Sequence, residues 1–296
     1  MRITRRAFGM GAAASLVAGK SIAQMSVGTG TLTTVSDGHL ILPADFILGA
    51  LPEADRDAAA AIAGLAGDTY QTPCNLAIYQ DGQRTILFDA GSGSNFMPSA
   101  GQILDNLDAI GVAPEDVTHV IFTHAHPDHI WGVLDDFGDL LFTEASLHIG
   151  QDEADYWLDP ATVDTIGEAR ASFAVGAKNR IEAIAGNLNT FGDGDTVIPG
   201  VVARASYGHT PGHMAFLLND AALIVGDAIG NGHLALARPH WPSGSDQDPE
   251  TGIATRTALL ADLADTALPM VGFHLPNGGM GRIEKDGDAY RFQGDI

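Results

Sequence analysis

Four side chains that commonly bind metal lie within six positions of the stretch "FTHAHPDHIWG": His124, His126, Asp128 and His129. The stretch overlaps an apolar run, "VIF", which predicts a buried strand that delivers the cluster. Residues i and i+2 of an extended backbone point to the same side, so His124 and His126 can reach one ion together. The chain then turns at Pro127 and directs Asp128 and His129 elsewhere. A chance cluster in a solvated polar loop is the alternative. The spacing favours two adjacent metals over the single zinc of an H-E-x-x-H helix.

Three further candidate ligands stand where predicted strands end: His213 in "GHTPGH", Asp227 in "IVGDA" and His274 in "GFHLP". Taken singly, each is more often an ordinary core residue than a metal ligand. Together with the first four they complete a set of seven, and functional residues gather at strand ends in layered α/β folds. Imidazole and carboxylate ligands without thiolate favour zinc, with Mn²⁺, Co²⁺ or Fe²⁺ as alternatives.

The ordered set of seven, with Asp89 upstream, resembles the metallo-β-lactamase superfamily over roughly residues 30–290. The tract "GHTPGHMAFLL…IVGDA…FHLP…GMGRIE" is most similar to methyl parathion hydrolase-like enzymes and to the quorum-quenching N-acyl homoserine lactonases. The resemblance implies that His124, His126 and His213 hold one metal, that Asp128, His129 and His274 hold the other, and that Asp227 bridges them. Two features depart from the lactonase pattern, namely Ile130-Trp131 and the loop 228–247.

The chemistry that this resemblance implies is hydrolysis by a hydroxide shared between two divalent metal ions about 3.5–4 Å apart. Lactone, ester and phosphotriester centres are the expected targets. Asp128 and Asp227 are the expected catalytic carboxylates, with Asp128 orienting the nucleophile or moving its proton. Asp89 and His209 are candidates for fixing the orientation of the ligands from behind.

Several other functions compete with this hypothesis. A β-lactamase or a glyoxalase II-like thioesterase would use the same metal site. A mono-iron dioxygenase of this fold tends to lack parts of the second site, all of which are present here. A non-catalytic periplasmic metal-binding protein is a further alternative. The sequence has no G-x-S-x-G motif for a serine hydrolase and no glycine-rich nucleotide loop.

The elements that must position these residues follow a repeated order of strands and then helices. A strand, a turn at Asp37-Gly38 and a second strand are expected first, followed by a hairpin around Asp81-Gly82. Helices are expected over 100–110 and 164–186, and Asp248-Pro249 predicts the start of a helix that runs to Thr266. The order fits a four-layer αβ/βα sandwich of the α/β class, in one domain spanning 24–296.

The first 23 residues are expected to be a twin-arginine signal peptide. "TRRAFGM" is followed by an apolar stretch too short to span a membrane and by the cleavage-like "SIA". The expected mature protein is therefore periplasmic, free of the membrane, and a client of the twin-arginine export machinery. Removal of residues 1–23 takes away four cations and no acid, so the net charge moves from −22 to −26. Such a charge disfavours nucleic acid as a partner. The oligomeric state stays open, a dimer included.

A small neutral molecule is the expected substrate, because anionic substrates need a fixed cation. Arg238 and Arg282 are the cations that the sequence places within plausible reach of the metals, and Arg238 is the candidate for binding a carboxylate. The side chains considered for the pocket wall are aromatic: Trp131, Tyr156, Trp157, His240 and Trp241.

Overall fold

The computed structural model describes residues 23–65, 67–230 and 232–294. Nearly all of the expected signal peptide, residues 1–22, therefore lies outside the described residues. Among the residues that are described, no helix combines the length and the apolar character needed to cross a membrane.

Two seven-stranded mixed sheets form the centre of the molecule, and each follows the order of the chain. The first runs from β1 to β7: Gln24–Val27, Gly30–Pro43, Thr69–Gln80, Thr85–Phe88, His119–Ile121, Ser146–Gly150 and Leu188–Phe191. The second runs from β8 to β14: Thr196–Ile198, Val201–Ala205, Met214–Leu218, Ala222–Gly226, Met270–Gly272, Met280–Asp286 and Ala289–Gln293. The α-helices are α1 to α9: Ala44–Leu48, Glu53–Ile62, Ile103–Ala109, Pro127–Ile130, Gln151–Leu158, Thr162–Thr165, Ala171–Ile184, Leu234–Ala237 and Pro249–Thr266.

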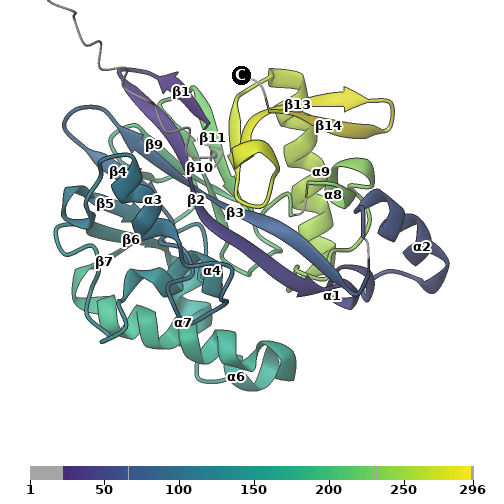
Figure 1. The fold of residues 1–296 in the computed structure, drawn as a ribbon, viewed down its shortest axis with the longest axis horizontal. Helices are drawn as coiled ribbons and strands as arrows, with labels where there is room; N and C mark the ends of the chain where they lie inside the picture. Colours follow the sequence, from purple (N-terminus) through teal and green to yellow (C-terminus); the bar gives the residue numbers. More distant parts are fainter. Residues whose placement is uncertain (1–22, 66, 231, 295–296) are drawn as a thin grey trace, which may run out of the picture.

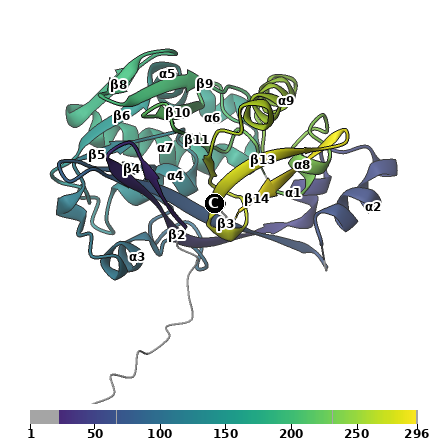
Figure 2. The same ribbon diagram turned by 90° about the horizontal axis from the view of Figure 1, so that it is seen from above.

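Three apolar clusters show how the layers pack. Residues of both sheets, such as Phe88 and Phe216, share the cluster between the sheets. A second cluster joins the outer face of the first sheet to α3, α4, α5 and α7. A third joins the second sheet to α8 and α9. The order helix, sheet, sheet, helix confirms the predicted four-layer αβ/βα sandwich, which Figures 1 and 2 show from two sides.

The long strands β2 and β3 extend beyond the body of the first sheet and end beside α1 and α2 (Figure 1). The sequence predicted a strand, a turn at Asp37-Gly38 and a second short strand, and this turn is wrong, because β2 is continuous with a shifted register there. Buried Asp37 accepts hydrogen bonds from the backbone N–H groups of Ser92, Gly101 and Ile103. These bonds fix the loop 91–103 against a bulge in the strand, so no reversal of the chain occurs.

Other predicted elements agree with the structure to different degrees. The hairpin of β3 and β4 is present. Helix α9 begins at Pro249 and ends at Thr266 as predicted, with the Asp248 carboxylate accepting a hydrogen bond from the N–H of Thr251. The helix expected over 164–186 begins only at Ala171, after a 3-10 turn at Glu168–Arg170.

Candidate metal centre

The candidate site lies at the carboxyl ends of parallel strands from both sheets. Strands β4 and β5 are parallel neighbours in the first sheet, and β11 and β12 are parallel neighbours in the second. Asp89 follows β4, the His124 cluster follows β5, Asp227 follows β11, and His274 comes shortly after β12. Because the two sheets pack face to face, these four strand ends converge on one place.

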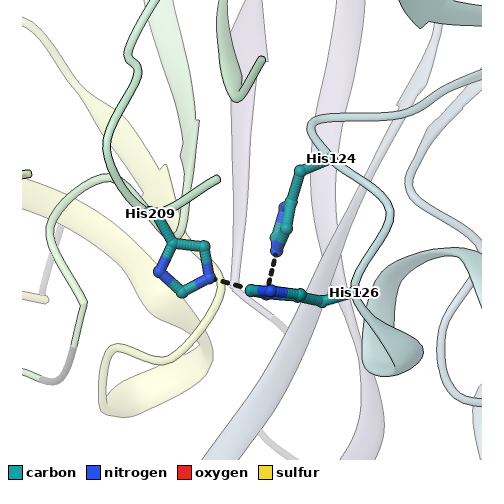
Figure 3. Close-up of side chains that lie close together, drawn as sticks. All are labelled: His124, His126 and His209. Carbon is teal, nitrogen blue, oxygen red and sulfur yellow. Dashed lines mark hydrogen bonds between the residues drawn. The ribbon is translucent and has the colours of Figure 1, made fainter. Parts of the chain in front are cut away.

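Three buried histidines form the first group, called here the three-histidine group: His124, His126 and His209. The Nε2 atom of His124 lies 3.0 Å from Nδ1 of His126, and that Nδ1 atom lies 2.9 Å from Nε2 of His209. Figure 3 shows the three rings turned toward one another from two different loops. The expectation that His124 and His126 face one point is confirmed. The convergence of three imidazole nitrogens suits a divalent cation.

His213 stays a predicted ligand, and the structure places it beside the three-histidine group. The resemblance assigned it to the same metal as His124 and His126, with His209 behind the ligands. In the structure His213 belongs to neither group of candidate ligands. Its Nδ1 atom contacts the Ser206 hydroxyl at 2.8 Å, and its Nε2 atom accepts a hydrogen bond of 3.1 Å from the N–H of Asp227. The Nδ1 contact orients the ring so that Nε2 points toward Asp227, and the ring centroid of His213 lies 4.8 Å from that of His124.

Four residues form the second group, called here the mixed group: Asp128, His129, Asp227 and His274. His274 Nε2 lies 3.2 Å from carboxylate oxygens of both Asp128 and Asp227. His129 Nε2 lies 3.5 Å from Asp227 Oδ1. The other oxygen of Asp227 lies 3.4 Å from Nε2 of His209, so Asp227 contacts both groups.

Buried polar atoms of the mixed group face one another without hydrogen bonds. Within the described chain, Asp128 Oδ2, His129 Nε2 and Asp227 Oδ1 have no hydrogen-bond partner. His129 Nε2 and Asp128 Oδ2 approach to 3.6 Å, which is an ion-pair distance without hydrogen-bond geometry. A buried polar atom without a partner is costly. A shared cation would satisfy all three atoms, so these residues fit a divalent metal.

The pKa values separate the two groups. Burial, reinforced by the neighbouring histidines, holds the pKa values of His124 and His126 well below their usual range, so both rings are neutral. Burial acts in the same direction on His129, but the carboxylates of Asp227, Asp128 and Asp89 outweigh it and raise the pKa to about 10. The same carboxylate effect raises the pKa of His274. A metal entering the mixed group must therefore displace protons.

The outer sides of three candidate ligand histidines are held by partners from elsewhere in the chain. Asp89 Oδ2 lies 2.9 Å from Nδ1 of His129, as the sequence suggested. The amide of Gln247 lies 3.0 Å from Nε2 of His126, and the backbone oxygen of Pro73 lies 2.7 Å from Nδ1 of His274. Such contacts orient imidazole ligands.

Two buried carboxylates near the three-histidine group escaped the sequence analysis. Asp246 Oδ1 lies 3.5 Å from Nδ1 of His209, and its other oxygen accepts a hydrogen bond of 3.0 Å from buried Arg256. Glu153, in α5, is fully buried. No spacing in the sequence links either residue to the site, because the histidine loops that they contact lie about 30 or more positions away along the chain.

Glu153 joins the two loops that carry the three-histidine group. One oxygen accepts from the N–H of Ala125 at 2.8 Å and from the Trp157 indole at 2.6 Å. The other accepts from the Thr210 hydroxyl at 2.6 Å and from the N–H of Gly212 at 3.1 Å. Burial raises the pKa of Glu153, although these four donors act against that effect.

A pocket with an empty volume of about 680 Å³, part of it open to solvent, lies over the candidate ligands. Its apolar wall comes from β2, α1 and the start of α7 and includes Leu40, Leu42, Phe46, Ile47 and Phe173. None of the aromatic residues considered from the sequence lines it among the described residues. Trp157 instead donates to Glu153, and Trp241 lines a separate cavity with Arg238. The sequence does not predict this wall, because β2 and the His124 cluster are far apart along the chain and meet only in the folded structure.

Comparisons with known proteins identify the family of this chain. The family described as the Metallo-beta-lactamase superfamily matches residues 69–270. Metallo-beta-lactamase domain-containing protein 1 of Xenopus laevis is 32% identical over 136 residues, which is 45% of this chain and 52% of that protein. The match thus spans about half of that relative's length. The uncharacterized protein YobT of Bacillus subtilis (strain 168) is 28% identical over 204 residues, covering 66% of this chain and 81% of YobT.

Two solved structures resemble the fold of this chain. The hydrolase AbOPH of the beta lactamase superfamily superposes with a TM-score of 0.84 and 26% identity, covering 93% of this chain and 98% of that one. AidC, a dizinc quorum-quenching lactonase solved with N-hexanoyl-L-homoserine as product, has the same TM-score and coverage at 23% identity.

Proposed function

As a member of the metallo-beta-lactamase superfamily this chain is a metal-dependent hydrolase, and we propose that it uses two divalent ions to cleave neutral lactones or esters. The observation that carries the proposal is the pair of buried ligand groups joined by Asp227. In the proposed site His124, His126 and His209 hold one ion. Asp128, His129 and His274 hold the other, and Asp227 serves both. His213, which the sequence predicts at the first ion, is the alternative to His209 there. Zinc suits these ligands best.

When bound, the two cations would lower the pKa of water toward 7 and withdraw electron density from the substrate carbonyl. The remaining work falls to residues of the chain. Asp128 and Asp227 line the pocket beside the candidate ligands. The Asp128 carboxylate, which would hold an ion through one oxygen, is therefore also placed to orient an attacking water and to move its proton. Asp89 and Pro73 O hold His129 and His274 in position during the reaction.

The substrate class follows from the pocket wall. Leu40, Leu42, Phe46 and Ile47 offer an apolar surface that suits an acyl or alkyl chain beside the metals. The structural neighbour AidC, described as a lactonase, supports a lactone as one such substrate. Neutral lactones and esters are preferred in this proposal over β-lactams.

The test combines metal analysis with turnover. Protein purified without chelator is expected to contain close to two divalent ions per chain and to hydrolyse a medium-chain lactone and an aryl ester. Its kcat/KM for a penicillin or cephalosporin should be lower. Full activity at a reproducible single ion per chain would overturn the two-metal proposal, and preferred β-lactam turnover would overturn the substrate class.

We also propose that the segment 1–23 directs export to the periplasm through the twin-arginine machinery. The twin arginines Arg5 and Arg6, the short apolar stretch and the small-residue cleavage pattern support this.

A further inference from the structure

Among its described lining residues, the pocket over the candidate metal ligands contains one arginine, Arg170, and no lysine. Arg170 is the last residue of the 3-10 turn Glu168–Arg170 and directly precedes α7. Three positions later the Phe173 ring meets the His126 ring edge-on, with centroids 5.9 Å apart. The first turn of α7 is thus packed against the three-histidine group, and Arg170 lines the same pocket as His126 and His209.

The guanidinium of Arg170 is tethered at one corner. Within the described chain Arg170 makes one side-chain hydrogen bond: its Nη2 atom donates to the backbone oxygen of Gly244 at 2.6 Å. Gly244 lies close to α1, because a Cβ there would lie 1.9 Å from the backbone oxygen of Phe46, so the position has room only for glycine. Since a guanidinium carries five N–H donors, most of its donors remain available to a ligand in the pocket.

We propose that Arg170 binds an acceptor oxygen of the substrate outside the group that is cleaved: the amide carbonyl of a neutral acyl chain, or a carboxylate, which would extend the proposed neutral substrate class to anions. The apolar part of the substrate then lies against Leu40 and Phe46. This inference rests on the proposed function, because it assumes that cleavage occurs at the metal ligands. Arg170 is a specificity-determining residue in this view, since a planar guanidinium pairs with such oxygens at fixed geometry.

Arg238, the residue that the sequence favoured for binding an anion, does not line this pocket. Its Nη1 atom donates to the backbone oxygen of Ala237, and its guanidinium lies 5.7 Å from the Trp241 ring centroid in a separate cavity. Arg238 therefore provides a matched control of the same residue type.

A purely structural role for Arg170 makes a different prediction. Its bond to Gly244 also holds the loop that carries Asp246 and Gln247, which contact the ligand histidines. Loss of that support would lower metal content and would slow every substrate alike. The carboxylate of Asp246 also acts electrostatically on Arg170, so it balances part of the positive charge of Arg170.

The experiment compares two matched pairs of substrates. The amide pair is α-hexanoylamino-γ-butyrolactone and α-heptyl-γ-butyrolactone. The carboxylate pair is mono-p-nitrophenyl adipate and p-nitrophenyl hexanoate. Wild type, Arg170→Met, Arg170→Lys and Arg238→Met are assayed with zinc, and metal content is measured for each.

Arg170→Met is expected to lower kcat/KM by about tenfold or more for an acceptor-bearing member of at least one pair, mainly through KM. The partner without the acceptor should change by less than about twofold, since it makes no such bond. Arg170→Lys should fall between, and Arg238→Met should match wild type. The affected pair identifies the acceptor as amide or carboxylate.

An equal decrease for all four substrates, or no decrease for any, would overturn the role of Arg170. If the wild-type protein cleaves none of the four substrates, the proposed function fails. The role of Arg170 is then tested separately by measuring binding affinity. The non-hydrolysable acylamino and alkyl γ-lactams are then titrated calorimetrically into the zinc-loaded protein. Arg170→Met should weaken only the acylamino lactam, and an unchanged affinity for it would refute the assignment.

Discussion

The carboxylate of Glu153 accepts a hydrogen bond of 2.8 Å from the backbone N–H of Ala125, the residue between His124 and His126. Its second oxygen binds the loop that carries His209 through Thr210 and Gly212. A single buried side chain thus sets the separation of the two loops whose histidines face each other. The geometry of the three-histidine group depends on this acid as well as on the ligands.

Glu153→Gln is expected to weaken metal binding by about tenfold or more, as loss of outer contacts to ligands typically does. The amide NH₂ would face two donors in place of an acceptor, so one loop must move. Competition titration with a zinc chelator measures the affinity, with exposed Glu144→Gln as the control. A lower Tm with unchanged zinc affinity would show that Glu153 supports the fold alone.

His209→Ala and His213→Ala should have opposite effects on metal stoichiometry. Removal of His209 takes one nitrogen from the three-histidine group, so the content should fall from close to two ions toward one. His213→Ala should keep both ions and lower Tm, because the Ser206 hydroxyl and the N–H of Asp227 lose their partner. Elemental analysis and thermal melts decide between them. The reverse pattern would restore His213 as a ligand.

Asp227→Ala should reduce metal retention and turnover more than His274→Ala. Asp227 lies within 3.5 Å of His129, His209 and His274, and so contacts both groups. His274 belongs to the mixed group alone. The variants are compared by metal content after gel filtration and by lactone hydrolysis. Equal retention of both ions would contradict the bridging position.

Removal of metal by a chelator should lower Tm without unfolding the protein at room temperature. A ligand present at a thousandfold excess over its Kd stabilises the folded state by about 4 kcal/mol. In its absence, protonated His129 and His274 still neutralise Asp128 and Asp227, because their pKa values are raised. Thermal melts before chelation, after chelation and after zinc restoration test this. An unchanged Tm would mean that the groups bind no structural ion.

Arg5→Lys combined with Arg6→Lys should block delivery to the periplasm, since "TRRAF" carries the targeting signal seen in the sequence. Fractionation of a tagged full-length chain measures the periplasmic share, with Arg2→Lys as the control outside the pair. An unaltered periplasmic yield would show that another signal is read.

Local sequence was sufficient for features that depend on neighbouring residues. The spacing of His124 and His126 follows from the alternation of side chains on extended backbone, and the structure brings their nitrogens to 3.0 Å. Asp248 and Pro249 mark the start of α9 because capping is satisfied within one turn. The repeated order of strands and helices likewise predicted the four layers.

Tertiary structure decided how two nearby histidines are placed and which cation enters the pocket. His209 and His213 lie in one short tract, and only the structure shows that His209 Nε2 approaches His126 to 2.9 Å while His213 contacts Ser206 and the N–H of Asp227. Arg170, not Arg238, lines the pocket because α7 packs against His126 through Phe173. These outcomes depend on how distant segments pack, and local spacing carries no information about the direction of a ring or a guanidinium across such a contact.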